Sequence, residues 1–189
     1  MKRGFDQAAT ATSAVYWPPQ LARQPEVSRC ITPDPMLSSC DPWLSKGTYV
    51  LLNARGGTAL DVTGNMDIQG HEFHGGVNQQ WRFIPTGRGW AIQSGRNGKD
   101  GKPLYLSFKS RLREQAVLTA SKVPLSWCVW DVDGALRITW PGADYVAELS
   151  GWGCDEPGAH VQLMRLKEGE LRQLWYFSRC SGFDVDPKA

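Results

Sequence analysis

The chain has 189 residues, enough for one domain with a substantial core but too few for two of ordinary size. Its 21 basic and 19 acidic residues are interspersed, so no long basic stretch is available to bind phosphate, which argues against a nucleic-acid partner. No run of 18 or more apolar residues occurs, which argues against membrane insertion.

Residues 1–46 hold half of the twelve prolines. Proline fixes φ and removes a backbone donor, so this stretch is predicted to be an extended or partly ordered arm. The segment that follows the first basic residues is rich in Ala and Thr and lacks the strong apolar core of a signal peptide. We therefore expect a cytoplasmic or non-conventionally secreted protein.

The cysteines are Cys30, Cys40, Cys128, Cys154 and Cys180, an odd number with no CxxC pair. This pattern argues against a disulfide scaffold and against a zinc site. Free thiols are expected, although Cys30 and Cys40 could pair in an oxidising compartment.

From Gly47 to residue 180 the sequence changes to short segments rich in Val, Leu, Ile, Tyr and Trp, separated by Gly, Asn, Asp and Pro. Period-two alternation and regularly recurring turn residues predict an all-β barrel or sandwich. Residues 181–189 are then a C-terminal tail. The twelve candidate strands are TYVLLN, TALDV, DIQGHEF, QQWRFI, GWAIQS, PLYLSF, QAVLTA, WCVWDV, ALRITW, DYVAEL, AHVQLM and QLWYFS.

The strand pattern repeats three times. The ending QQWRF at Trp81 returns as CVWDV at Trp130 and as QLWYF at Trp175, and each copy holds four candidate strands. Units of about 45 residues cannot each bury a face alone, but three of them close a six-stranded barrel capped by three hairpins. The sequence therefore predicts a β-trefoil with pseudo-threefold symmetry.

Gln79-Gln80-Trp81 and Gln173-Leu174-Trp175, with Leu60-Asp61-Val62 upstream, resemble the Gln-x-Trp motif of the ricin B-type lectin family, particularly its fungal members. The resemblance covers about residues 47–180. It implies a carbohydrate-binding protein without catalysis or cofactor, with glycans or glycoproteins as partners and one shallow pocket per repeat.

Carried over to this chain, the family pattern places the principal carbohydrate pocket in the first repeat, on Asp61, Gln69, His71, Asn78 and Gln79. His71 stands where an aromatic ring is expected, so Phe73 or His74 becomes the candidate for a flat stacking surface. A carboxylate accepting from two neighbouring hydroxyls and an amide that donates and accepts are what a sugar requires.

In this interpretation Trp81 is a core residue, Asn78 points toward the ligand, and Gln79 mainly ties the hairpin or helps to hold Asp61. An alternative remains open at this stage: Asp61 could simply bond the backbone of the turn at residues 63–65.

The other repeats fit the family pattern less well. In the second, Tyr105 occupies the expected carboxylate position and Cys128 the expected Gln position, so no sugar pocket is predicted. In the third, Arg172 replaces the Asn, and a weak second site is expected. Its residues are Glu148, Gln162, Met164 and Gln173.

No metal site is predicted. His71 and His74, with Glu72 between them, have ligand chemistry but lie on a strand-to-loop segment, where alternation should turn neighbours to opposite faces. Nothing places Asp61 and Asp67 across a cleft as a glycosidase pair would require.

The main alternative function is a protein-binding trefoil such as a protease inhibitor, acting through exposed loops at residues 95–102 and 111–115. A homodimer that links the sugar sites would raise avidity.

Overall fold

The computed structural model describes residues 44–151 and 157–180, all of which belong to the unit Met36–Ala189. The predicted arm up to residue 43, the tail 181–189 and the proposed pairing of Cys30 with Cys40 lie outside the described residues. Leu44, three residues before the predicted start of the barrel, is buried in the core.

The described residues form twelve strands, which confirms the all-β prediction, and two short 3₁₀ helices. No helix among them has the length and apolar character needed to span a membrane. The strands are β1 (Gly47–Asn53), β2 (Ala59–Val62), β3 (Ile68–His71), β4 (Gln80–Pro85), β5 (Trp90–Asn97), β6 (Pro103–Phe108), β7 (Ala116–Ser121), β8 (Cys128–Val132), β9 (Ala135–Thr139), β10 (Tyr145–Leu149), β11 (Ala159–Arg165) and β12 (Trp175–Arg179). The helices are η1 (Val77–Gln79) and η3 (Leu171–Gln173).

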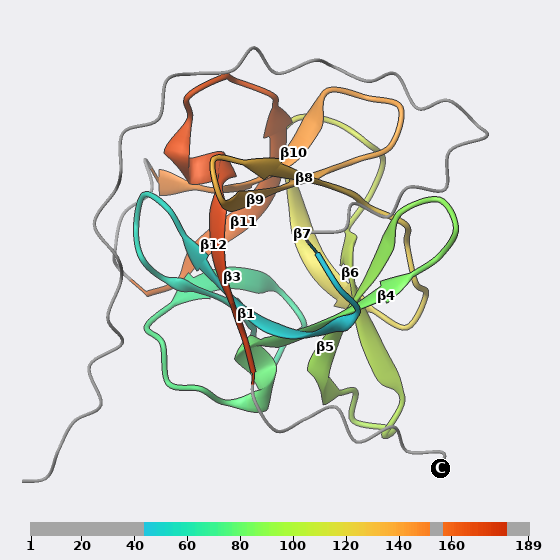
Figure 1. Cartoon of the computed structure of the whole chain (residues 1–189). Coiled ribbons are helices and arrows are strands. Elements are labelled where there is room, and N and C mark those ends of the chain that lie inside the picture. The colour runs from blue at the N-terminus through green and yellow to red at the C-terminus, as the bar shows by residue number, and fades with distance from the viewer. Residues whose placement is uncertain (1–43, 152–156, 181–189) are drawn as a thin grey trace, which may run out of the picture. The chain divides into compact units, whose positions relative to one another are not determined.

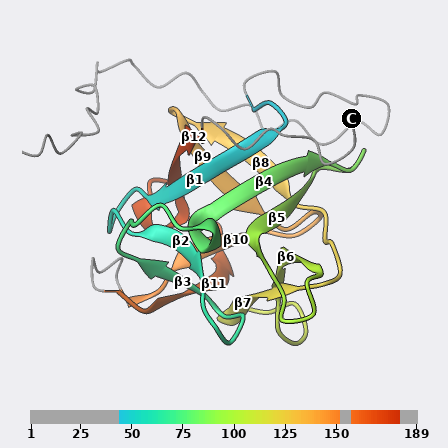
Figure 2. The ribbon, with the colours of Figure 1, turned by 90° about the horizontal axis from the view of Figure 1, so that it is seen from below.

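Six of these strands close a barrel. Antiparallel pairs join β12 to β1, β1 to β4, β4 to β5, β8 to β9 and β9 to β12. Two backbone hydrogen bonds between Trp90 and Trp127, of 2.8 and 2.9 Å, complete the ring between β5 and β8. Figure 2 shows β1 and β4 side by side, and Figure 1 shows β12 beside β1.

The remaining strands form three hairpins, β2–β3, β6–β7 and β10–β11. Strand β11 pairs with both β3 and β7, and an isolated bridge between Asp67 and Thr119 joins the other two hairpins. Three hairpins thus meet in a ring, one from each repeat, and the predicted β-trefoil is confirmed.

One tryptophan from each repeat anchors the core. Trp81, Trp127 and Trp175 are fully buried, and each indole N–H donates to a backbone carbonyl of its own repeat. Such a bond satisfies the one polar group that this large side chain carries into the core. The acceptors are Leu60 (2.8 Å), Leu106 (3.1 Å) and Ala147 (3.3 Å).

The sequence pattern matched Trp130 to Trp81, and this match is wrong, because the second repeat's counterpart of Trp81 is Trp127. Trp130 is 39% exposed, and its indole N–H donates to Thr139 Oγ1 at 2.9 Å. Trp127 lies three positions earlier, and an odd separation along an extended chain places two side chains on opposite faces. Because Trp127 faces the core, Trp130 faces solvent.

Candidate functional site

The first-repeat site is built on the β2–β3 hairpin. Asp61 on β2 lies directly opposite Gln69 on β3, and His71 lies two residues further along the same strand. Opposed residues and residues two apart share a face of the sheet. Asp61, Gln69 and His71 therefore share one face, as the family pattern implied.

The Asp61 carboxylate is buried, with 3% of the residue exposed. Its Oδ2 accepts from Asn78 Nδ2 at 2.8 Å and from Gln79 Nε2 at 3.0 Å, and His74 Nε2 lies 3.5 Å away. Within residues 44–151 and 157–180, every hydrogen bond and ion pair of this carboxylate falls on Oδ2. Oδ1 therefore has no partner among the described residues, and the alternative that Asp61 bonds the backbone of the turn at residues 63–65 does not hold.

Gln79 holds both Asp61 and the loop that follows β3. Its amide nitrogen also donates to the Glu72 carbonyl at 2.8 Å, and its oxygen accepts from the N–H groups of His74 (2.9 Å) and Gly75 (3.2 Å). Gln79 has no exposed surface, so its hydrogen bonds serve to position Asp61 and the loop. This agrees with the prediction that Gln79 mainly ties the hairpin or helps to hold Asp61.

Gly76 allows this loop to pack tightly. A Cβ at Gly76 would lie 2.6 Å from Asn78 Oδ1 and 2.7 Å from His74 Cε1, closer than real Cβ contacts come. Gly75 adopts a positive φ of 72°, which favours glycine. A side chain at Gly76 would therefore displace Asn78 Oδ1 and the His74 ring, and one at Gly75 would strain the backbone.

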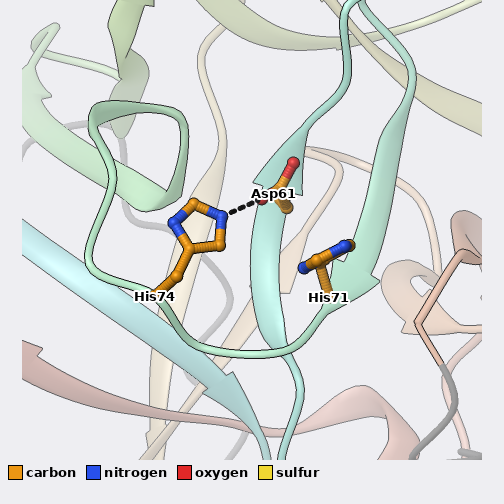
Figure 3. Close-up of side chains that lie close together, drawn as sticks. All are labelled: Asp61, His71 and His74. Carbon is orange, nitrogen blue, oxygen red and sulfur yellow. Dashed lines mark ion pairs between the residues drawn. The ribbon is translucent and has the colours of Figure 1, made fainter.

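Three predicted side chains lie at the exposed side of the site. Phe73 is 49% exposed, and the rings of His71 and His74 lie 5.7 Å apart at 77° to one another. Figure 3 shows His71 at the end of its strand, His74 on the loop beyond and Asp61 between them. Strand alternation was expected to turn His71 and His74 to opposite faces. This expectation is wrong because β3 ends at His71, and His74 lies on the loop that follows.

The third repeat reproduces the register of the first. Glu148 lies opposite Gln162 and Val146 opposite Met164, as Asp61 lies opposite Gln69 and Ala59 opposite His71. Gln173 Nε2 donates to Glu148 Oε2 at 2.8 Å and to the Arg165 carbonyl at 2.8 Å. The scaffold of the site is therefore present in both repeats.

The third-repeat carboxylate differs because both of its oxygens are engaged. Arg172 Nη1 lies 3.4 Å from Glu148 Oε1, and the same guanidinium forms a two-pronged bond with Glu170. The hydrogen bond from Arg172 lowers the pKa of Glu170 to about 2. In the first repeat Asn78 contacts only Oδ2 of Asp61 and leaves Oδ1 without a partner. In the third repeat Arg172 stands in the place of Asn78 and contacts the corresponding oxygen, Oε1 of Glu148.

The second repeat has no carboxylate at the equivalent position. The Trp127 bond to Leu106, matched to the Trp81 bond to Leu60, places Ser107 where Asp61 stands, so the earlier choice of Tyr105 is wrong. The position of the motif glutamine, two residues before the core tryptophan, is held by Leu125. The earlier match of this position to Cys128 is therefore also wrong. The conclusion that this repeat lacks the polar set of a sugar pocket is unchanged.

A hollow of about 240 Å³ lies at residues 169–172 and Arg55 and does not include Asp61. Sugar recognition through vicinal hydroxyls depends on convergent polar atoms, and a shallow surface supplies them as well as a deep one. The candidate site is therefore described from Asp61 and its neighbours, outside this hollow.

Comparison with known proteins identifies the family of this chain. A family model with the description "Ricin-type beta-trefoil lectin domain-like" matches residues 39–120. The ricin B-like lectin of Macrolepiota procera, solved in complex with lactose, is 36% identical with a TM-score of 0.66; the alignment covers 72% of this chain and 99% of that one. The chain belongs to the ricin B-type β-trefoil lectin family.

Two other solved structures resemble this ricin B-type lectin. The Rhizoctonia solani agglutinin is 26% identical over 72% of this chain and 97% of its own, with a TM-score of 0.62. The designed threefold-symmetric protein ThreeFoil, 20% identical over 71% of this chain and 99% of its own with a TM-score of 0.63, shows the fold alone. Comparison with curated proteins finds no match.

Sequence reasoning missed three parts of this lectin's site. The contact of His74 with Asp61 and the close packing of Gly76 depend on the path of the 72–79 loop. The loop is also anchored by the bond from Gln79 to the Glu72 carbonyl. Every residue has a backbone carbonyl, so the sequence gives no sign of this contact. Among these, only the Gly75-Gly76 pair left a trace in the sequence, as a tight turn.

Proposed function

We propose that this lectin-family protein binds carbohydrate without catalysing a reaction, and that its principal glycan site is the Asp61–Asn78 pair of the first repeat. The observation that carries the proposal is the geometry of Asp61. Its carboxylate is buried and fixed through Oδ2, and Oδ1 carries no partner among the described residues.

The chemistry of the pair suits two neighbouring sugar hydroxyls. Asp61 Oδ1 accepts from one or both of them. Asn78, which is partly exposed, uses one N–H on Asp61 and keeps a second N–H donor for the ligand. A charged acceptor makes stronger hydrogen bonds than a neutral one. His71 and Phe73 provide ring surface for the apolar face of the sugar.

A terminal galactose is the first ligand class to test. Support comes from the Macrolepiota procera lectin, 36% identical, whose structure contains lactose. His71 occupies a position beside Asp61 that bears on sugar choice, so lactose and other disaccharides should be compared directly.

One working site per chain is proposed. Arg172 and Gln173 each engage one oxygen of Glu148, and Glu148 is 3% exposed, so this carboxylate has no oxygen without a partner to offer a sugar, unlike Asp61. Monovalent affinity at a shallow solvated site is modest, so strong cell-surface binding requires avidity, for which a homodimer would serve. The second acid imagined for catalysis, Asp67, is instead ion-paired with Lys109.

The test is isothermal titration with lactose together with a glycan array on the full chain. Asp61→Asn should abolish binding, whereas Glu148→Gln should leave it within about twofold, since Glu148 is engaged by Arg172. Thermal unfolding by circular dichroism shows whether each variant is folded. Glycan binding that survives in folded Asp61→Asn would place the site elsewhere. An empty array combined with protease inhibition would support the loop-based alternative.

A further inference from the structure

Asp61, His71 and His74 form a convergent group of metal-ligating side chains. Each offers one ligand atom, and these atoms all lie within 4.8 Å of one another. The residues come from β2, from the end of β3 and from the loop after it, and Figure 3 shows the three side chains around one space. No other such group of three occurs among residues 44–151 and 157–180.

We propose that Asp61, His71 and His74 bind a divalent transition-metal ion of the zinc class, and that this ion and the glycan exclude each other. The exclusion, but not the metal site, rests on the proposed function. Two imidazoles and a carboxylate are a zinc-type ligand set, whereas magnesium and calcium prefer oxygen ligands. Three protein ligands leave a fourth position of a tetrahedral ion open.

The spacing is close to what one ion requires. Two ligand atoms at about 2.1 Å from a tetrahedral ion lie about 3.4 Å apart. His74 Nε2 and Asp61 Oδ2 are already 3.5 Å apart. The other distances between ligand atoms are up to 4.8 Å and must shorten when an ion binds. The histidine side chains have room to move, because His71 is partly exposed and the His74 side chain is 45% exposed.

The hydrogen-bond partners of Asp61 and His71 favour metal coordination by these two residues. Asp61 is oriented by Asn78 and Gln79, as metal-binding carboxylates commonly are by hydrogen-bond donors. His71 Nδ1 lies 3.2 Å from the Glu72 carbonyl, which can only accept, so Nδ1 carries the proton and Nε2 keeps its lone pair. Metal-ligating histidines typically make such a bond to a backbone carbonyl.

His74 changes its proton position when it binds metal. Gly76 N–H donates to His74 Nδ1, so the neutral ring carries its proton on Nε2, facing Asp61. Coordination at Nε2 moves this proton to Nδ1, and the Gly76 N–H loses its acceptor. This bond lies at the exposed surface, where water can replace the acceptor at small cost.

Competition follows because ion and sugar use the same carboxylate. The His71 ring, which faces the sugar in the proposed glycan site, is also a ligand of the ion, so each ligand takes side chains that the other needs. With strict exclusion, metal at ten times its own dissociation constant weakens the apparent lactose affinity about tenfold.

The metal site is tested without sugar, on the full chain, with Co²⁺ as the spectroscopic probe and Zn²⁺ as the displacing ion. We expect one Co²⁺ per chain with ligand-field bands and no thiolate charge-transfer band. That distinction matters because Cys128 and Cys180 are free thiols. His71→Asn and His74→Asn should each weaken binding at least tenfold, the low end of the 10–100-fold loss seen for supporting residues. His160→Asn, which changes the remaining histidine, on β11, should leave it unchanged.

Three results would each overturn the metal site. They are the absence of Co²⁺ binding, an unchanged Co²⁺ affinity in both His71→Asn and His74→Asn, and a thiolate charge-transfer band in the Co²⁺ spectrum. Lactose titration in chelator-treated protein, then with Zn²⁺ added, tests the exclusion. Simultaneous binding of both ligands would refute it. Because metal-free protein reports on lactose alone, failure of the glycan proposal is distinguished from failure of the metal proposal.

Discussion

Gln79 Nε2 donates to Asp61 Oδ2 at 3.0 Å, and both residues are buried. The same relationship recurs between Gln173 and Glu148 at 2.8 Å. The glutamine of the Gln-x-Trp motif therefore fixes the carboxylate of its own repeat in both places. What separates the two repeats is the neighbouring residue, Asn78 in one and Arg172 in the other.

Gln79→Ala should remove four hydrogen bonds and lower the free energy of unfolding by about 2–4 kcal/mol. Because the same bonds orient Asp61 and the 72–79 loop, lactose binding should be lost as well. Gln173→Ala removes three comparable bonds in the third repeat and should destabilise similarly while lactose binding persists. Urea unfolding and calorimetric titration measure the two effects. Equal loss of lactose binding in both variants would show that general destabilisation is the cause.

Trp127→Ala should cost about 3–5 kcal/mol of unfolding free energy, because it empties a core position and leaves the Leu106 carbonyl without its donor. Trp130→Ala should cost about 1 kcal/mol or less, since that side chain is 39% exposed. Equilibrium urea denaturation of the two variants gives the comparison. A reversed order would restore Trp130 as the core residue of the second repeat.

Gly76→Ala should weaken lactose binding by about tenfold or more, because its Cβ collides with Asn78 Oδ1 and the His74 ring. Gly64→Ala is the matched control, since nothing lies within 4 Å of a Cβ there and its φ is not in the left-handed region. Both variants are titrated with lactose under identical conditions. Unchanged binding in Gly76→Ala would mean that Asn78 and His74 do not shape the sugar site.

Glu170 should contribute pH-dependent stability. Its pKa is lowered from 4.5 to about 2, chiefly by the hydrogen bond from Arg172. A carboxyl with a lowered folded-state pKa stabilises fully above its unfolded pKa, and this contribution is lost as pH falls through the folded value. The free energy of unfolding of wild type should therefore exceed that of Glu170→Gln by about 1 kcal/mol or less at pH 7, and most of this difference should be gone at pH 2. Urea midpoints at pH 7, 4.5 and 2 measure it; a constant difference would mean that ionisation is not responsible.

The pattern of the sequence was sufficient for the fold. Alternating apolar residues set the twelve strands, and turn residues set their limits, because both depend on the conformation of a few adjacent residues. Asp61 and Asn78 could also be named in advance, because the resemblance to ricin B-type lectins implies that these two motif positions converge on one pocket. The same reasoning failed at Trp130, where two tryptophans lie three residues apart and only one face of the strand meets the core.

The sequence by itself determined the β-trefoil and the polar residues of its first repeat. Only the tertiary structure decided that Asp61 keeps one oxygen free, that Arg172 occupies the equivalent oxygen of Glu148, and that His74 turns back toward Asp61. These outcomes depend on contacts between side chains 13 to 24 positions apart, such as Asp61 with His74 and Glu148 with Arg172. Residue types and strand periodicity do not specify the direction in which such side chains point, because packing against the rest of the barrel sets it.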